Sequence, residues 1–106
     1  MELLKSHTDL EQSKKLGEIL PIESADMHYP LPCSEYNIPV FGKGGFGSTP
    51  CWSLTALLNA IPSSTLDSSD SHHYRIRCNE RYSEWYDNPI DACYNMVLKL
   101  HKLNIL

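Results

Sequence analysis

The most regular hydrophobic pattern lies near the C-terminus, in the segment DNPIDACYNMVLKLHKLNIL. Four side chains there have the i, i+3, i+4, i+7 spacing of a helix with one buried face: Cys93, Met96, Val97 and Leu100. Asp87 or Asn88 can cap this helix, and Pro89 suits its first turn. The pattern predicts a helix over residues 88–103.

Strict alternation precedes this helix in the segment HYRIRC. The residues divide into an apolar and a basic face, with Tyr74, Ile76 and Cys78 on one and Arg75 and Arg77 on the other. The segment RYSEWY follows after Asn79-Glu80, which predicts an antiparallel hairpin over residues 73–86. A lone hairpin is marginally stable in water, so we expect the C-terminal helix to cover the face that carries Tyr74 and Ile76.

A weaker signal predicts a helix near the N-terminus. Thr8 and Glu11 have the spacing of a capping box, in which the side chain of each residue accepts a hydrogen bond from the backbone N–H of the other. Pro21 ends the helix, because the residue before a proline avoids helical geometry. The helix is predicted over residues 8–20.

The middle of the chain is predicted to be mostly irregular. Residues 21–49 are rich in proline and glycine and form a loop-rich stretch, either a functional surface or a mobile one. Short extended pieces are expected at Met27–Tyr29 and Ile38–Phe41. Pro50 suits a first helical turn, which predicts a helix over residues 50–60. The segment SSTLDSSDSHH then indicates a solvated loop.

Together these elements predict a small single-domain α+β protein over residues 1–106. An antiparallel hairpin or three-stranded sheet packs against the C-terminal helix, with one N-terminal and one central helix at its end or edge. The 106 residues suit one domain, which can bury roughly 65% of its unfolded surface.

Composition limits the function. The chain is 42% hydrophobic and 21% charged, as in ordinary folded domains, and its net charge of −4 argues against a protein that coats nucleic acid. It has no apolar run of the ~20 residues that span a membrane and no segment typical of a signal peptide. We therefore expect a cytoplasmic protein with reduced structural thiols rather than two disulfides. Its four cysteines are Cys33, Cys51, Cys78 and Cys93.

One motif is similar to a catalytic element. The segment FGKGGFGSTPCW has G-x-G-x-x-G spacing, and its candidate cofactor-binding residues are Gly42, Gly44 and Gly47. A dinucleotide site also needs a preceding strand, which Pro39 interrupts, and an acidic residue at a strand end, whereas Asp67 lies in a Ser-rich segment. We expect a turning connector and no cofactor, with nucleotide or phosphate binding as the alternative.

One further group of side chains and one further cysteine are of residue types found in reactive sites. Asp70, His72, His73 and Cys78 include metal-ligating types, but adjacent histidines on a strand point to opposite faces and no zinc-type spacing is present. Cys51 lies near a predicted helix N-terminus, although its apolar neighbours favour a buried structural thiol. We therefore predict no metal site and no catalytic residue.

The hairpin carries the candidate interaction surface: Arg75, Arg77, Arg81 and Trp85. These arginines alternate with aromatic residues, and such an arrangement can stack on and neutralise single-stranded nucleic acid. The aromatic residues are Tyr74, Tyr82, Trp85 and Tyr86. In the other interpretation, the aromatic side chains face the helices as core, and the arginines pair with Glu80, Glu84 and Asp87. The acidity of the chain favours this second interpretation.

Three phrases resemble recurring pieces of a group of short uncharacterised open reading frames of gut-bacterial genomes, prophages and mobile elements. They are LEQSKKLGEILPIESADMHY, PCWSLTALLNAIP and YDNPIDACYNMVLKLHKLNIL, about half of the chain. The phrase NPIDACYNMVLKL is also similar to the C-terminal helix of small phage proteins with an α-β-α sandwich. The resemblance implies a mobile-element context and no activity. We therefore expect a non-catalytic protein-interaction or accessory module, whose partner is another protein or a second copy rather than nucleic acid or a membrane.

The predicted C-terminal helix can be tested by two substitutions. Leu100→Ala should lower the free energy of unfolding by about 2–5 kcal/mol, because it leaves a cavity in the core. That is a large part of the roughly 5–10 kcal/mol that such a domain has, so the thermal midpoint should fall clearly. Lys99→Ala, on the predicted solvent face, should barely move it. Equal midpoints would contradict the assigned helix phase.

Overall fold

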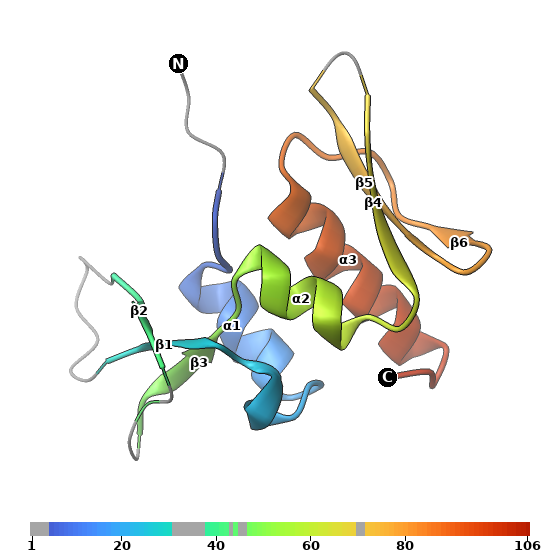
Figure 1. Cartoon of the computed structure of the whole chain (residues 1–106). Coiled ribbons are helices and arrows are strands. Elements are labelled where there is room, and N and C mark those ends of the chain that lie inside the picture. Colours follow the sequence, from blue (N-terminus) through green and yellow to red (C-terminus); the bar gives the residue numbers. More distant parts are fainter. Residues whose placement is uncertain (1–4, 31–37, 43, 45–46, 70–71) are drawn as a thin grey trace.

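The chain folds into a group of helices with a small antiparallel sheet on either side of it (Figure 1). A computed structural model describes residues 5–30, 38–42, 44, 47–69 and 72–106, to which the following elements belong. In chain order they are α1 (Leu10–Gly17), the 3-10 helix η1 (Ile22–Ser24), β1 (Met27–Tyr29), β2 (Val40–Phe41), β3 (Thr49–Cys51), α2 (Leu54–Ala60), β4 (Ser64–Ser68), β5 (Tyr74–Cys78), β6 (Arg81–Tyr82) and α3 (Pro89–Lys102).

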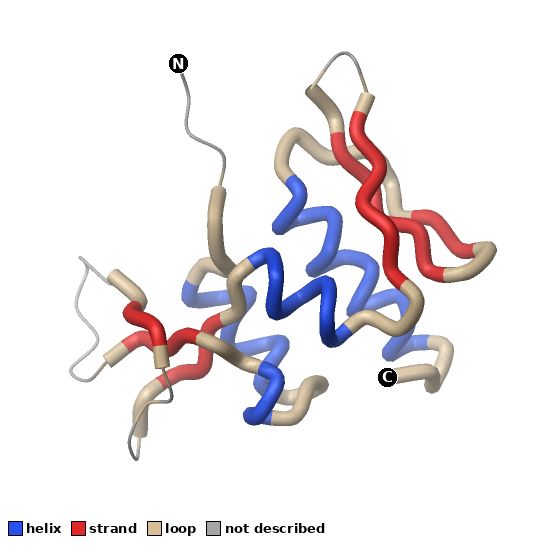
Figure 2. Tube along the Cα trace, in the orientation of Figure 1, coloured by secondary structure: helices blue, strands red, loops and turns tan. Residues whose placement is uncertain are grey.

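The two sheets are short and separate. The first has the strand order β2-β1-β3 and the second the order β4-β5-β6, and every pair within them is antiparallel (Figure 2). Helix α1 packs on β3 of the first sheet, and α3 packs on β5 of the second and on α2. The described residues thus form the predicted small α+β domain, but with a sheet at each side of the helices.

Helix α3 provides the largest part of the main core. Asn88 caps it and Pro89 is its first residue, as predicted, and the predicted stripe faces inward. Ile76 and Cys78 of β5 are buried against it. Each buried aliphatic side chain contributes roughly 1.5–3 kcal/mol. The buried residues of α3 are Pro89, Ile90, Ala92, Cys93, Met96, Val97 and Leu100.

The predicted N-terminal helix begins later than expected. Helix α1 starts at Leu10, and its capping box is formed by Asp9 and Gln12 instead of Thr8 and Glu11. The Asp9 carboxylate accepts from the Gln12 N–H at 2.8 Å, and the Gln12 amide oxygen accepts from the Asp9 N–H at 3.1 Å. Both pairs fit the motif, and the difference is decided by tertiary packing, because Thr8 is fully buried.

The predicted helix over residues 50–60 is wrong at its start. Pro50 lies in β3, where it pairs with His28 of β1, and α2 begins at Leu54 with Ser53 as its cap. Strand β3 is at the edge of its sheet, a position that tolerates a residue without a backbone N–H. The extended piece predicted at Met27–Tyr29 is strand β1, and the piece predicted at Ile38–Phe41 contains β2.

The predicted loop after α2 is also wrong, because it contains β4. Ser64 to Ser68 pair with β5 along its whole length, so the predicted hairpin is part of a three-stranded sheet. Two contacts explain why a Ser-rich segment forms a strand. Leu66 packs against the main core, and the Asp67 carboxylate lies 3.2 Å from Nε of Arg75.

Thr8 attaches the N-terminal segment to the first sheet. Its N–H donates to the carbonyl of Trp52 at 3.0 Å, and its hydroxyl accepts from the Trp52 N–H at 3.1 Å. The hydroxyl also lies 2.8 Å from that of buried Ser13 in α1. Its carbonyl accepts from the Tyr29 hydroxyl at 2.7 Å, and burial raises the pKa of Tyr29, which keeps the phenol protonated as a donor.

Asp91 joins the same segment to α3. One carboxylate oxygen accepts from Lys5 Nζ at 3.1 Å and from Gln12 Nε2 at 2.8 Å. The other accepts from Asn88 Nδ2 at 2.8 Å. Residues from the N-terminal segment, α1 and the α3 cap therefore meet at a single side chain.

The role of Thr8 can be tested with substitutions that separate its hydroxyl from its methyl group. Thr8→Val keeps the shape but leaves the buried Trp52 N–H without its acceptor, so it should cost about 1–3 kcal/mol of unfolding free energy. Thr8→Ser keeps the hydroxyl and should cost less. Chemical denaturation of the two variants measures the difference. Wild-type stability in Thr8→Val would contradict this role.

Candidate interaction surface

The second sheet has one face on α3 and the other on solvent. Strand alternation puts Ile76 and Cys78 inside, which leaves Arg75 and Arg77 on the outer side. Directly opposite residues in neighbouring strands share a face, so Asp67 joins Arg75 there and Tyr82 joins Arg77. We call this surface the outer face. It comprises Thr65, Asp67, Arg75, Arg77, Tyr82 and Trp85.

Arg75 is held in place by three groups on the outer face. Its guanidinium carbon lies 4.5 Å from the ring centre of Tyr82 and 4.6 Å from that of Trp85. Its Nε donates to the Asp67 carboxylate at 3.2 Å. Cation–π contacts of this kind at exposed sites contribute about 0.5–1 kcal/mol each. The arrangement fixes two aromatic rings around a cation, and both rings stay accessible, with 43% of Tyr82 and 44% of Trp85 exposed.

The expectation that these aromatic residues form core is wrong for Tyr82 and Trp85. It holds better for Tyr86, which packs partly buried against the main core. The predicted partners of the arginines are also wrong for Arg75, which pairs with Asp67, a residue from the strand that the sequence had not predicted.

The other two arginines of the candidate surface remain available. Arg77 and Arg81 are exposed, and within the described part of the chain no carboxylate forms a salt bridge with either. Arg77 belongs to the outer face, whereas Arg81 lies opposite buried Cys78. Of the four predicted residues, Arg75 and Trp85 are thus in contact, Arg77 shares their face, and Arg81 does not. The sequence drew attention to the arginines and to the aromatic residues Tyr82 and Trp85, but did not identify Asp67.

The glycine motif connects two strands. Gly42 follows β2, and β3 follows Gly47 by two residues, so the first helix turn after the motif is separated from it by a strand. Gly42 and Gly47 have positive φ angles of 102° and 84°, which glycine adopts most easily. A side chain at Gly44 would collide with Ser48 and with the His28 ring. These three glycines have the geometry of a tight connection, and a phosphate cradle needs a helix N-terminus directly after it.

The other predicted groups do not come together. Asp70 and Cys33 lie outside the described residues. His72 and His73 are exposed, whereas Cys78 is buried and donates from Sγ to the carbonyl of Pro62 at 2.9 Å. Within the described ranges, no three His, Cys, Asp or Glu side chains are grouped as metal ligands would be.

The buried thiols have the environment of structural residues. Burial raises the pKa of Cys93 to about 12 and also raises that of Cys51, so both are protonated at neutral pH. A nucleophilic cysteine needs the opposite shift. Cys51 Sγ lies 3.4 Å from the carbonyl of Thr8 and is part of the contact between the N-terminal segment and β3.

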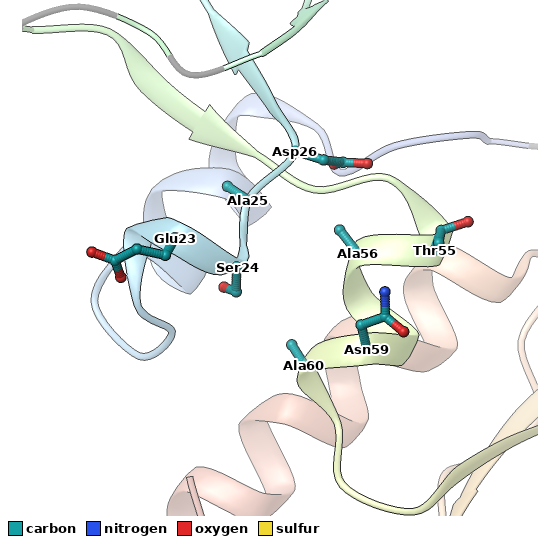
Figure 3. Close-up of a pocket in the computed structure, with 8 residues that line it drawn as sticks. All are labelled: Glu23, Ser24, Ala25, Asp26, Thr55, Ala56, Asn59 and Ala60. Atoms are coloured by element: carbon teal, nitrogen blue, oxygen red, sulfur yellow. The ribbon is translucent and has the colours of Figure 1, made fainter.

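A cleft of about 440 Å³ lies between the η1 segment and α2 (Figure 3). Asn59, Ala56 and Ala60 of α2 line one wall, opposite the segment from Glu23 to Asp26. Two of its polar side chains already have structural partners. The Asp26 carboxylate accepts from the N–H and hydroxyl of Ser53, and Ser24 Oγ accepts from Trp52 Nε1 at 2.9 Å. These bonds hold together the elements on either side of the cleft.

Comparison of the chain with protein-family models, with curated proteins and with solved structures gave no significant match. No helix in the described part of the chain is long and apolar enough to cross a membrane. Fold and surface together define a small α+β domain with a preformed arginine–aromatic cluster on the open side of a sheet.

Proposed function

We propose that this chain is a non-catalytic interaction module that binds a partner protein through the outer face of its second sheet. One observation carries the proposal: Trp85 and Tyr82 enclose the Arg75 guanidinium and are still more than 40% exposed. Trp, Tyr and Arg are the residues most enriched among those that dominate binding energy at protein interfaces.

The cluster has the properties of a binding site that is formed before the partner arrives. Arg75 is fixed by its two rings and by Asp67, so ordering its long side chain on binding costs little entropy. A flexible arginine would lose this freedom at the moment of association. Soluble monomers seldom expose large aromatic rings side by side, and where they do, the rings commonly mark an interaction site.

The charges of the outer face indicate the chemistry of the partner. Arg77 is exposed and has no salt bridge among the described residues. A partner surface with carboxylates beside an apolar strip would pair with this cation and cover the rings. Electrostatic complementarity of this kind sets specificity and association rate more than affinity.

Single-stranded nucleic acid is the second candidate, favoured by the same rings and arginines. Two features weigh against it. One cation of the face is neutralised by Asp67, and the whole chain carries a charge of −4. The proposed setting is the bacterial cytoplasm, in a phage or mobile-element context, on the basis of the resemblance of its three phrases to short open reading frames of such elements.

The proposal can be tested by affinity capture from host cells, with Trp85→Ala as the variant. Phe41→Ala is the matched control, because Phe41 is an exposed aromatic residue of the first sheet. The captured partner should be retained by wild type and Phe41→Ala and lost from Trp85→Ala. With the purified partner, loss of a residue that dominates binding should weaken the Kd by about 30-fold or more.

Equal capture by Trp85→Ala and wild type would contradict the proposal. Binding of single-stranded oligonucleotides at low salt, falling steeply as salt rises and lost in Trp85→Ala, would replace the protein partner with nucleic acid.

A further inference from the structure

The outer edge of β4 is the best-formed open strand edge of the described residues. By strand order, the edges of the two sheets are β2, β3, β4 and β6. Strands β2 and β6 have two residues each, and β3 carries Pro50 in its centre. Strand β4 has five residues, pairs with β5 without a bulge, and contains no proline and no cationic residue. Its one charged side chain is Asp67, which Arg75 holds on the outer face, so β4 lacks the short length, proline, bulge and lysine by which edge strands ordinarily avoid pairing with another chain.

The hydrogen bonds on the far side of β5 determine which backbone groups of β4 are free. Tyr74 exchanges backbone bonds with Tyr86, at 2.7 and 2.8 Å, and the carbonyl of Ile76 accepts from the Ser83 N–H at 2.9 Å. In an antiparallel sheet, alternate residues of a central strand bond to opposite neighbours. The residues of β5 that bond toward β4 are therefore Arg75 and Arg77.

Their partners in β4 follow from the register. Arg75 lies opposite Asp67 and Arg77 opposite Thr65, so the backbones of these two β4 residues bond inward to β5. The residues between and beside them direct their N–H and C=O groups away from the sheet: Ser64, Leu66 and Ser68. Helix α2 approaches this strand at its N-terminal end, where Ser64 Oγ donates to the carbonyl of Leu58 at 2.7 Å.

We propose that a second copy of this chain pairs antiparallel with this edge, with Leu66 opposite Leu66 of the second copy. The strand sequence STLDS is self-complementary about its centre. In this register Ser64 lies opposite Ser68, and the Thr65 hydroxyl lies opposite the Asp67 carboxylate. No like charges face one another, and about six backbone hydrogen bonds form.

The dimer joins the two second sheets into one six-stranded sheet. It goes beyond the proposed function, because it uses the backbone edge of β4 and leaves Trp85 and Tyr82 exposed. A contact centred on five residues is small beside the ~1,200 Å² of a stable interface, so association should depend on concentration.

Sedimentation of the whole chain from micromolar to millimolar concentration tests the proposal. The apparent mass should rise from 12.1 kDa toward twice that value. Thr65→Asp places a carboxylate opposite Asp67 of the second copy and should weaken the dimer roughly three- to tenfold. Thr65→Asn has the size of Asp without its charge and should leave the dimer unchanged. Within one chain the Thr65→Asp carboxylate faces Arg77, so the fold is kept, which thermal unfolding verifies.

Amide hydrogen exchange gives an independent measurement. The amides of Leu66 and Ser68 should become protected as concentration rises, whereas the amide of Asp67 is protected throughout. A chain that stays at 12.1 kDa, or a dimer that Thr65→Asp leaves unchanged, would overturn the proposal. Dissociation by Trp85→Ala but not by Thr65→Asp would assign self-association to the outer face and reject the edge. Capture of a partner protein at Trp85 is measured separately and can succeed or fail without affecting this result.

Discussion

The carboxylate of Asp91 is the polar interaction that joins the N-terminal segment and α1 to α3, beside the buried core that α1 and α3 share. It lies in the first turn of α3 and receives hydrogen bonds from Lys5, Gln12 and Asn88. Its surroundings act on its pKa in two directions. Partial burial raises the pKa, but the bonds from Asn88 and Gln12 and the charge of Lys5 outweigh this and lower it. The ionised carboxylate is thus the form that holds the N-terminal segment and α1 on α3.

This connection matters because neither sheet is large enough to persist alone. The strands of the first sheet have two or three residues, and it depends on α1 and on the buried bonds of Thr8 to Trp52 and Ser13. The second sheet depends on α3, which covers Ile76 and Cys78. Once α3 occupies the inner face of that sheet, strand alternation leaves Arg75, with its aromatic neighbours, facing solvent. The candidate interaction surface follows directly from how the core is filled.

Sequence patterns predicted the parts of the fold that are stabilised by periodic hydrophobic burial. The stripe from Cys93 to Leu100 identified α3 because each of its apolar positions is buried, and the alternation in HYRIRC identified β5 for the same reason. Strand β4 was missed because Leu66 is its only apolar residue, and its pairing depends on a strand from a later part of the chain. The propensity of a short segment carries no information about a strand elsewhere in the chain that pairs with it.

The candidate surface was predicted in its composition but not in its geometry. Arg75 and Trp85 attracted attention as residue types, yet the sequence favoured aromatic residues inside the core. Only the register between strands brings Asp67 beside Arg75, and only the path of the chain after β6 brings Trp85 beside the guanidinium. The cap of α1 shows the same limit, since Thr8 and Asp9 both fit the motif and burial of Thr8 decides between them.

The pH dependence of unfolding in wild type and Asp91→Asn tests most directly whether the Asp91 carboxylate joins the N-terminal segment and α1 to α3. The pKa of Asp91 is lowered in the folded state, so its contribution is complete above its unfolded value of about 3.9 and is lost as pH falls through the folded value. Wild type should therefore be more stable than Asp91→Asn at pH 7, and the difference should shrink as pH falls below the unfolded value and through the lowered folded value. Equal stability at pH 7, or a difference that does not change with pH, would contradict the account.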